Sequence, residues 1–150
     1  MNSDQRLSLV LHALMHLVHA ARPLTSEELA AHLDTNPVVL RRAMAGLRRD
    51  ALVVSGRGRG GGWQLGRTPD RITLRQVHEA LGSPAMLAMG LRIGNPGCLV
   101  EGAVNRALAP AFADAQARLL ERLGQVTLAV LAEDVDAHAP RGAARDMFHA

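Results

Sequence analysis

One glycine-rich stretch limits what this chain can fold into more than any other feature. Residues 55–65, SGRGRGGGWQL, hold five glycines and two arginines between two apolar segments. Trp63 and Leu65 alternate with a polar residue, as in a strand with one buried face. Glycines adopt the positive φ angles of tight turns without steric cost. The stretch therefore predicts a β-hairpin over residues 52–65 with a glycine-rich tip.

The same glycines do not predict a nucleotide-binding enzyme. Gly56, Gly58 and Gly61 have the spacing of a dinucleotide-binding loop, but such a loop needs a helix directly after it to hold the pyrophosphate. Gly66 and Pro69 follow too closely for that helix. We find no nucleophile–base set, paired carboxylates or metal motif in a credible arrangement, so we do not expect an enzyme.

Two short helices are predicted before the hairpin. Thr25 and Glu28 have capping-box spacing at the start of a helix that ends near His32. After a brief turn, Asn36 can cap a second, arginine-rich helix that runs to about Asp50. Two short helices joined by a tight turn form a helix-turn-helix, and a hairpin that follows it is a wing.

The remaining segments complete a mostly α fold with one small β-hairpin. Apolar residues at helical spacing predict a first helix over residues 3–21, and a capped helix follows Thr73. A long helix is predicted over residues 99–123, where Pro110 should kink or divide it, and Thr127 caps a short last helix. The predicted organisation is a winged helix-turn-helix domain, a linker, a long helix with the short closing helix, and a flexible tail, at residues 1–82, 83–98, 99–135 and 136–150.

Composition and charge favour a polyanionic partner. The chain is 48% hydrophobic, enough for a core, and its single cysteine excludes an internal disulfide and suits a reducing cytosol. No apolar run is long enough to span a membrane and no signal-peptide pattern is present, so we expect a cytoplasmic protein. Residues 1–80 hold 11 arginines against 7 acidic side chains (net +4), whereas residues 81–150 hold 6 against 7 (net −1). A basic first half favours a polyanion such as nucleic acid.

The second helix of the helix-turn-helix, residues 36–50, supplies most candidate DNA-binding residues. At 100° per residue its apolar stripe consists of Leu40, Ala43, Met44 and Leu47, which predicts that the other faces are exposed. The start of such a helix reaches base edges, so the candidate readers are Val38, Arg41 and Arg42. Phosphate contacts are expected from Arg48 and Arg49, and groove or phosphate contacts from the wing residues Arg57 and Arg59. A solvated arginine face is the alternative for any one of them.

The run LRRAMAGLRRDALVVSGRGRGGGWQL, followed by ITLRQVHEAL, resembles the Rrf2 family of winged-helix transcription regulators, which includes IscR, NsrR and CymR. The segment RLGQVTLAVL is also similar to the family's closing segment. This chain has Ala51 where the family pattern has glycine, and Trp63 where it has tyrosine. The resemblance implies a homodimer, in which the long helix near residues 99–123 crosses its partner, and binding to a two-fold operator.

The best-known family members hold an iron–sulfur cluster through three cysteines, and this chain keeps only Cys98. One thiolate cannot hold a cluster that takes four ligands. Some relatives recruit ligands from the first helix, where His12, His16 and His19 share a face at metal-ligating spacing. They lie opposite the apolar stripe, so we expect an exposed or partner-facing row of histidines, with no metal and no cofactor. Cys98 itself is either a redox sensor at a helix start or a small packing residue.

The sequence thus predicts a cytoplasmic, dimeric transcription regulator, a repressor that binds double-stranded DNA. The alternatives are a winged-helix module that binds proteins and has lost DNA binding, and a regulator that senses oxidation through Cys98. Whether a small effector binds is left open by the sequence, as is the operator.

Overall fold

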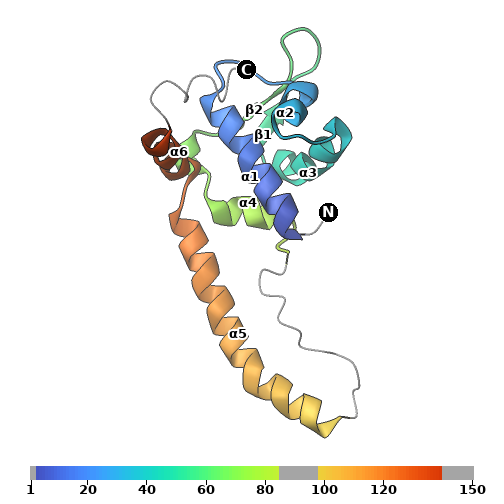
Figure 1. Ribbon diagram of the computed structural model, residues 1–150, viewed down its shortest axis with the longest axis vertical. Helices are drawn as coiled ribbons and strands as arrows, with labels where there is room; N and C mark the ends of the chain where they lie inside the picture. Colours follow the sequence, from blue (N-terminus) through green and yellow to red (C-terminus); the bar gives the residue numbers. More distant parts are fainter. Residues whose placement is uncertain (1–2, 85–97, 140–150) are drawn as a thin grey trace.

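The computed structural model describes residues 3–84 and 98–139 of the chain (Figure 1). Within them the protein is mostly helical with one two-stranded hairpin, as the sequence predicts. The elements are α1 (Ser3–His19), α2 (Ser26–His32), α3 (Pro37–Arg49), β1 (Val53–Ser55), β2 (Trp63–Leu65), the 3₁₀ helix η1 (Pro69–Arg71), α4 (Leu74–Ala80), α5 (Leu99–Gln125) and α6 (Leu128–His138). None of the helices in these two ranges has the length and hydrophobicity that crossing a membrane requires.

The helix-turn-helix begins at the caps that the sequence indicates. The Thr25 hydroxyl accepts a hydrogen bond from the backbone N–H of Glu28, and the Glu28 carboxylate accepts one from the N–H of Thr25. The Asn36 side chain accepts from the N–H of Val38 at 2.8 Å, which starts α3. Each cap satisfies N–H groups that a helix end leaves without an internal partner. The boundaries of α2 and α3 are therefore determined locally.

The hairpin is an antiparallel pair in which Val53 lies opposite Leu65 and Ser55 opposite Trp63. The loop between the strands contains Gly58 and Gly60, both with φ of 78°, and it projects beyond the rest of the fold at the top of Figure 1. A winged helix-turn-helix with an outward loop is thus present, as predicted.

The hairpin is held on the helix-turn-helix by contacts that the sequence did not indicate. Leu24, just before α2, forms an isolated antiparallel bridge with Trp63 of β2. The indole N–H of Trp63 donates to the hydroxyl of Ser26 at 3.0 Å, and this hydrogen bond is buried. The backbone of Gly62 lies so close to that of Leu24 that a Cβ atom would come within 2.7 Å of its carbonyl oxygen. The base of the wing and the start of α2 are therefore one packed unit.

One hydrophobic core joins the first four helices, the hairpin and α6. Its fully buried side chains include Val10 and Leu14 of α1, Leu29 of α2, Leu40, Met44 and Leu47 of α3, Val53, Ile72, Val77 and Leu128. The last of these belongs to α6, which packs against α1 and η1. The predicted organisation groups this closing helix with the long helix, whereas in the structure it packs on the winged-helix core.

The long helix α5 extends away from that core as a single element (Figure 1). Pro110 lies inside it without dividing it. Its C-terminal end is joined to α4, because the N–H of Leu74 donates to the carbonyl of Val126 at 2.9 Å. After α5, α6 continues to His138, so the first three residues of the predicted tail are helical.

Candidate nucleic-acid interface

The two sides of α3 are as the helical periodicity predicts. Leu40, Ala43, Met44 and Leu47 are buried against the core. Val38 is 58% exposed, and all four arginines of the helix, Arg41, Arg42, Arg48 and Arg49, are exposed. A Cβ atom on Gly46 would come within 2.0 Å of the Ala80 carbonyl oxygen, so this part of α3 packs closely on the end of α4. The outward side of α3 is thus fixed relative to the rest of the fold.

The exposed start of α3 carries a second apolar side chain. Val39 is 38% exposed next to Val38, and the residues predicted from the sequence do not include it. The signal was available, because Val39 lies outside the stripe of Leu40, Ala43 and Met44 on a helical projection. Two exposed β-branched side chains beside a helix start can contact the methyl groups of thymine bases in a major groove.

The four arginines of α3 differ in what they contact. Arg41 lies 3.4 Å from Glu27 of α2, and Arg48 donates to the hydroxyl of Ser55 at 3.5 Å. Arg42 forms no ion pair among residues 3–84 and 98–139. The contact of Arg48 joins the last turn of α3 to strand β1 of the wing, so the two candidate DNA-contacting elements are connected directly.

Arg49 is engaged at the C-terminal end of α3. Its Nε donates to the Asp50 carboxylate at 2.9 Å and its terminal nitrogen to the Ala80 carbonyl at 3.4 Å. Nearby, Arg67 donates to the backbone carbonyl of Asp50 at 3.3 Å. Guanidinium groups near a helix C-terminus satisfy its free carbonyls and interact favourably with the helix dipole. The structure thus joins Arg49 to the C-terminal end of α4, a contact that its position in the sequence does not indicate.

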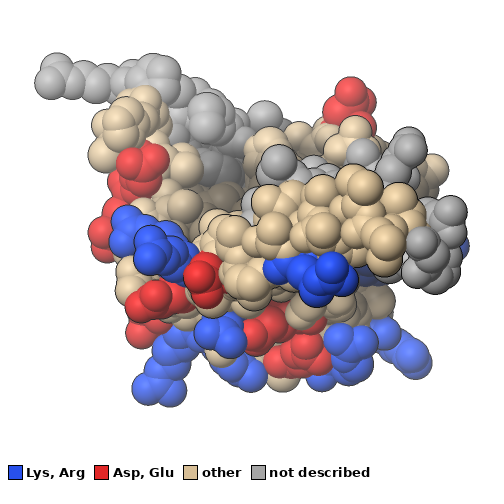
Figure 2. Space-filling model, turned by 90° about the horizontal axis from the view of Figure 1, so that it is seen from below, with Lys and Arg blue, Asp and Glu red and all other residues tan. Residues whose placement is uncertain are grey.

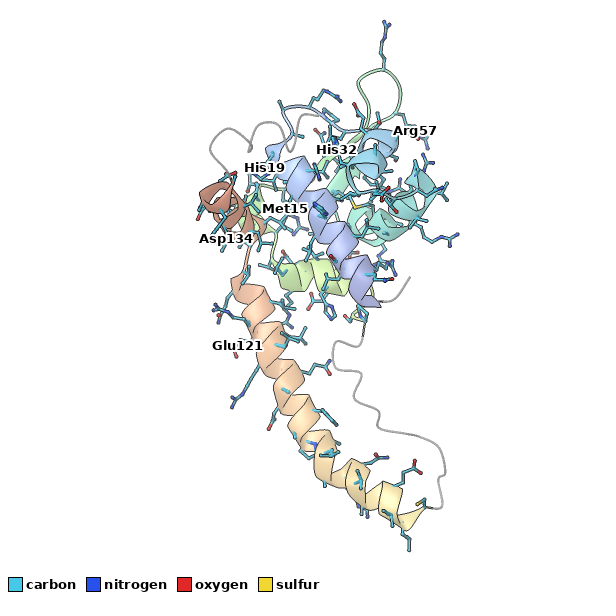
Figure 3. The ribbon with its side chains drawn as sticks, in the orientation of Figure 1. Met15, His19, His32, Arg57, Glu121 and Asp134 are labelled. Carbon is cyan, nitrogen blue, oxygen red and sulfur yellow. The ribbon has the colours of Figure 1, made fainter. Side chains whose placement is uncertain are left out.

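The wing arginines are presented by the loop as predicted. Arg57 and Arg59 are both exposed, and in the described part of the chain neither forms an ion pair. Figure 3 labels Arg57 on this loop, at the same end of the molecule as α2. Because a Cβ atom on Gly58 or Gly60 would meet no heavy atom within 4 Å, little bulk surrounds these two side chains.

Charge near the start of α2 and α3 is mixed rather than uniformly positive. Figure 2, which views the molecule from below, likewise shows arginines along one edge with acidic side chains between them. Two of the acidic groups lie in the first turn of α2: Glu27, beside Arg41, and Glu28, which accepts from Arg22 at 2.6 Å. The hydrogen bond from Arg22 lowers the pKa of Glu28 to about 2, so this carboxylate is charged at neutral pH.

The prediction of an exposed or partner-facing row of histidines on α1 is wrong for His16. His12 is exposed, but His16 is only 4% exposed, because α2 covers this face of α1. The His16 ring stacks on that of His32 from α2 with 4.8 Å between centroids, and lies 5.4 Å from the ring of His12. Burial, together with the nearby histidines, lowers the pKa of His16 to about 4. His19 contacts the Met15 carbonyl and Asp136 of α6 (Figure 3).

Cys98 occupies the N-cap position of α5 and is half-buried. Its side chain forms no capping hydrogen bond there. This position agrees with the helix start that the sequence indicates, and it leaves both readings of the cysteine open.

Comparison with known proteins identifies the family. Residues 3–134 match the family described as Rrf2, iron-dependent transcriptional regulator. The chain belongs to the Rrf2 family. It is therefore grouped with transcriptional regulators rather than with enzymes, as the resemblance of its wing motif implied.

Individual relatives agree with this assignment. YwnA of Bacillus subtilis (strain 168), whose name describes a candidate HTH-type transcriptional regulator, is 29% identical over 125 residues, which cover 83% of this chain and 92% of YwnA. The fold is shared with T. potens IscR (TM-score 0.66, 20% identity, 97% of this chain and 96% of IscR). It is also shared with CymR (YrzC), the global cysteine regulator of B. subtilis (TM-score 0.60, 24% identity, 89% and 95% covered).

The iron in the family description does not fit the residues of this Rrf2 chain. Cys98 is its single cysteine, and the segment before it, residues 84–97, contains no histidine, aspartate or glutamate. Within residues 3–84 and 98–139 no three histidine, cysteine, aspartate or glutamate side chains are placed to hold a metal ion. The stacked rings of His16 and His32 lie face to face instead of converging on one point. A cluster with four protein ligands is not supported by this set.

Proposed function

We propose that this Rrf2 protein is a homodimeric repressor that binds double-stranded DNA through α3 and the wing. The observation that carries the proposal is the connection between these two elements. Arg48 of α3 contacts Ser55 of the wing, and Trp63 at the other strand is hydrogen-bonded to Ser26 of α2. An exposed basic helix and an exposed basic loop are thereby held on one packed unit, which supports simultaneous contact with two neighbouring grooves.

Each exposed residue has a proposed contact. Val38 and Val39 would lie against thymine methyl groups, and Arg41 and Arg42 would donate to guanine, to which arginine binds bidentately. Arg48 would contact a phosphate, as would Arg57 and Arg59 unless they enter the minor groove. Arg49, whose side chain is 68% exposed, would also contact a phosphate, although its guanidinium donates to Asp50 and to the Ala80 carbonyl at the end of α4.

Dimerisation through α5 is the second part of the proposal. No residue of this 27-residue helix is buried in the single chain. Its N-terminal half exposes the large apolar side chains Leu99 (87%), Val100 (72%), Val104 and Leu108. Apolar surface of this extent on one helix is typical of an interface. A two-fold dimer would place two winged-helix units on a two-fold operator. In this arrangement residues 1–82 bind DNA, and residues 83–98 link them to the dimerisation segment, residues 99–135. Within that segment α5 supplies the dimer contact, while α6 packs on the winged-helix core. The protein would act in the cytoplasm.

The wing test uses Arg57→Ala and Arg59→Ala in a gel-shift assay with an operator selected by the wild-type protein. Each substitution should weaken binding about 5- to 50-fold, and loss of a phosphate contact should reduce the salt dependence by about one counterion. Arg75→Ala is the matched control, because this exposed arginine lies on α4 and pairs with Glu79.

Unchanged affinity in both wing variants would contradict the wing role while leaving the family assignment intact. If the wild-type protein showed no salt-dependent shift with any duplex, the protein-interaction module would replace DNA binding as the function.

A redox response through Cys98 is a second candidate. It rests on the position of the partly exposed thiol at the N-terminus of α5, where a helix start can favour the thiolate. Oxidant should then change DNA affinity in the wild type but not in Cys98→Ser. Equal affinity before and after oxidation in both proteins would remove this candidate.

A further inference from the structure

One acidic side chain lies at the proposed reading end of α3. The Arg41 guanidinium is 3.4 Å from a carboxylate oxygen of Glu27, which belongs to the first turn of α2. Arg41 is half-exposed and Glu27 is two-thirds exposed, so the pair adds little to stability by itself. Arg48 instead donates to a neutral hydroxyl, and Arg42, Arg57 and Arg59 form no ion pair within the described ranges. The contact therefore singles out one candidate base reader.

The neighbouring carboxylate has a different task. Glu28 accepts from the backbone N–H of Thr25 at 2.7 Å and from Arg22, and so caps α2. Glu27 makes no such capping contact. Its remaining local role is a favourable charge in the first turn of α2, where acidic side chains interact well with the helix dipole. Such a role would require no contact with α3.

We propose that Glu27 is a specificity-determining residue, which holds the guanidinium of Arg41 in the orientation that reads a base. The inference rests on the proposed function, since it concerns how α3 discriminates between DNA sequences. Arginine has a planar fork of five donors, so one nitrogen can remain with Glu27 while two others donate to a guanine edge. A long side chain that is already oriented loses less conformational freedom on binding.

The negative charge of Glu27 adds a second effect. A carboxylate near the duplex repels phosphates, and this repulsion opposes all DNA sequences alike. The orientation of Arg41 favours only the sequence with the matching base. Glu27 therefore lowers sequence-independent binding relative to operator binding, which raises the specificity ratio.

The experiment first selects an operator from a random duplex library with the full-length wild-type protein. Arg41→Ala then identifies the base pair whose discrimination depends on Arg41. Glu27→Gln and Glu27→Asp are measured against single-base variants at that position and against a scrambled duplex. The aspartate variant keeps the charge in the first turn of α2 but withdraws the carboxylate from Arg41. Glu79→Gln is the matched control, because Glu79 forms an exposed ion pair with Arg75 on α4.

Both Glu27 variants should lower discrimination at the Arg41-dependent base pair about 3- to 10-fold, and Glu27→Gln should also bind the scrambled duplex several-fold more tightly. Glu79→Gln should do neither. Wild-type discrimination in Glu27→Asp would overturn the inference and leave only the helix-dipole role. An Arg41→Ala variant with unchanged base preferences would also overturn it, while DNA binding by the wild type would still uphold the proposed function. If the wild type selected no sequence, the proposed function would fail, and this inference with it.

Discussion

Ala51 has a left-handed backbone, with φ of 55°, directly after the C-cap of α3. This region costs a residue with a Cβ atom about 1–2 kcal/mol, whereas glycine adopts it freely. The resemblance to the family pattern, which has glycine here, locates the same position. The chain thus carries local strain between α3 and the wing.

Replacing Ala51 with glycine should therefore stabilise the protein. We expect a gain of about 1 kcal/mol in the free energy of unfolding, because the relief of strain exceeds the added freedom of the unfolded chain. Urea denaturation measures it. Ala45→Gly, at an exposed position within α3, is the matched control and should lose about 1 kcal/mol. If Ala51→Gly and Ala45→Gly lost the same free energy of unfolding, the backbone at Ala51 would not be strained.

His16 predicts how stability depends on pH. Its pKa is lowered in the folded protein to about 4 from an ordinary value of 6.5, first by burial and then by the charges of His32 on α2 and His12 and His19 on α1. The His16 side chain therefore binds a proton more readily in the unfolded chain than in the folded one. As a result, the free energy of unfolding is highest above about pH 6.5 and falls as the pH drops towards 4. The loss should reach roughly 3 kcal/mol.

The measurement is the midpoint of urea unfolding between pH 7 and pH 4. His16→Phe keeps a ring against His32 and should reduce this dependence, whereas His138→Gln, at an exposed position on α6, should not. The part that remains would come from buried His78, whose pKa burial also lowers. An unchanged slope in His16→Phe would assign the acid sensitivity to other groups.

At the scale of elements, the wing depends on contacts with residues distant in the sequence. The buried hydrogen bond from Trp63 to Ser26 links β2 to α2. Ser26→Ala would leave the indole N–H buried without its acceptor, which should cost about 1–3 kcal/mol of stability. Trp63 is the single tryptophan, so its fluorescence during unfolding reports on the wing directly. Ser8→Ala, on the exposed side of α1, should change neither the fluorescence nor the stability appreciably.

The elements that the sequence predicted are those with local causes. Thr25 with Glu28, Asn36, Thr73 with Gln76, and Thr127 all act as caps in the structure, because each needs only residues two or three positions away. The glycine-rich tip of the hairpin is equally local, and it was predicted too.

The features that the sequence missed depend on tertiary packing. His16 was expected to be exposed because it lies opposite one apolar stripe, yet α2 covers that second face of α1. The Glu27–Arg41 pair and the docking of α6 on α1 join residues that no periodicity relates. The hydrogen bond from Arg49 to the Ala80 carbonyl likewise depends on the position of α4, which the sequence does not indicate.

At the scale of the whole molecule, the proposed dimer would cover the exposed apolar side chains of α5. Val104→Asp should convert the proposed dimer to a monomer, because it places a charge among exposed apolar side chains, and it should weaken operator binding at least 10-fold. Light scattering after size-exclusion chromatography measures the mass. Ala109→Asp, at an exposed position of α5 about 140° from Val104 and at least about 80° from the other exposed apolar residues at 100° per residue, is the control and should remain dimeric. A Val104→Asp protein of unchanged mass would exclude this face as the contact.

The attachment of α5 at one end has a mechanical consequence. Thr73 and Thr127 form a bridge that fixes the base of α5 to the strand-like segment between the wing and α4. A helix of 27 residues is about 40 Å long. A rotation of α5 by about 5° at this joint would displace the N-terminal end of the helix by roughly 3–4 Å. A small rotation near Thr127 would therefore produce a large displacement at the far end of α5. In the proposed dimer, the separation of the two half-sites would thus be governed by a joint far from the bases that α3 would contact.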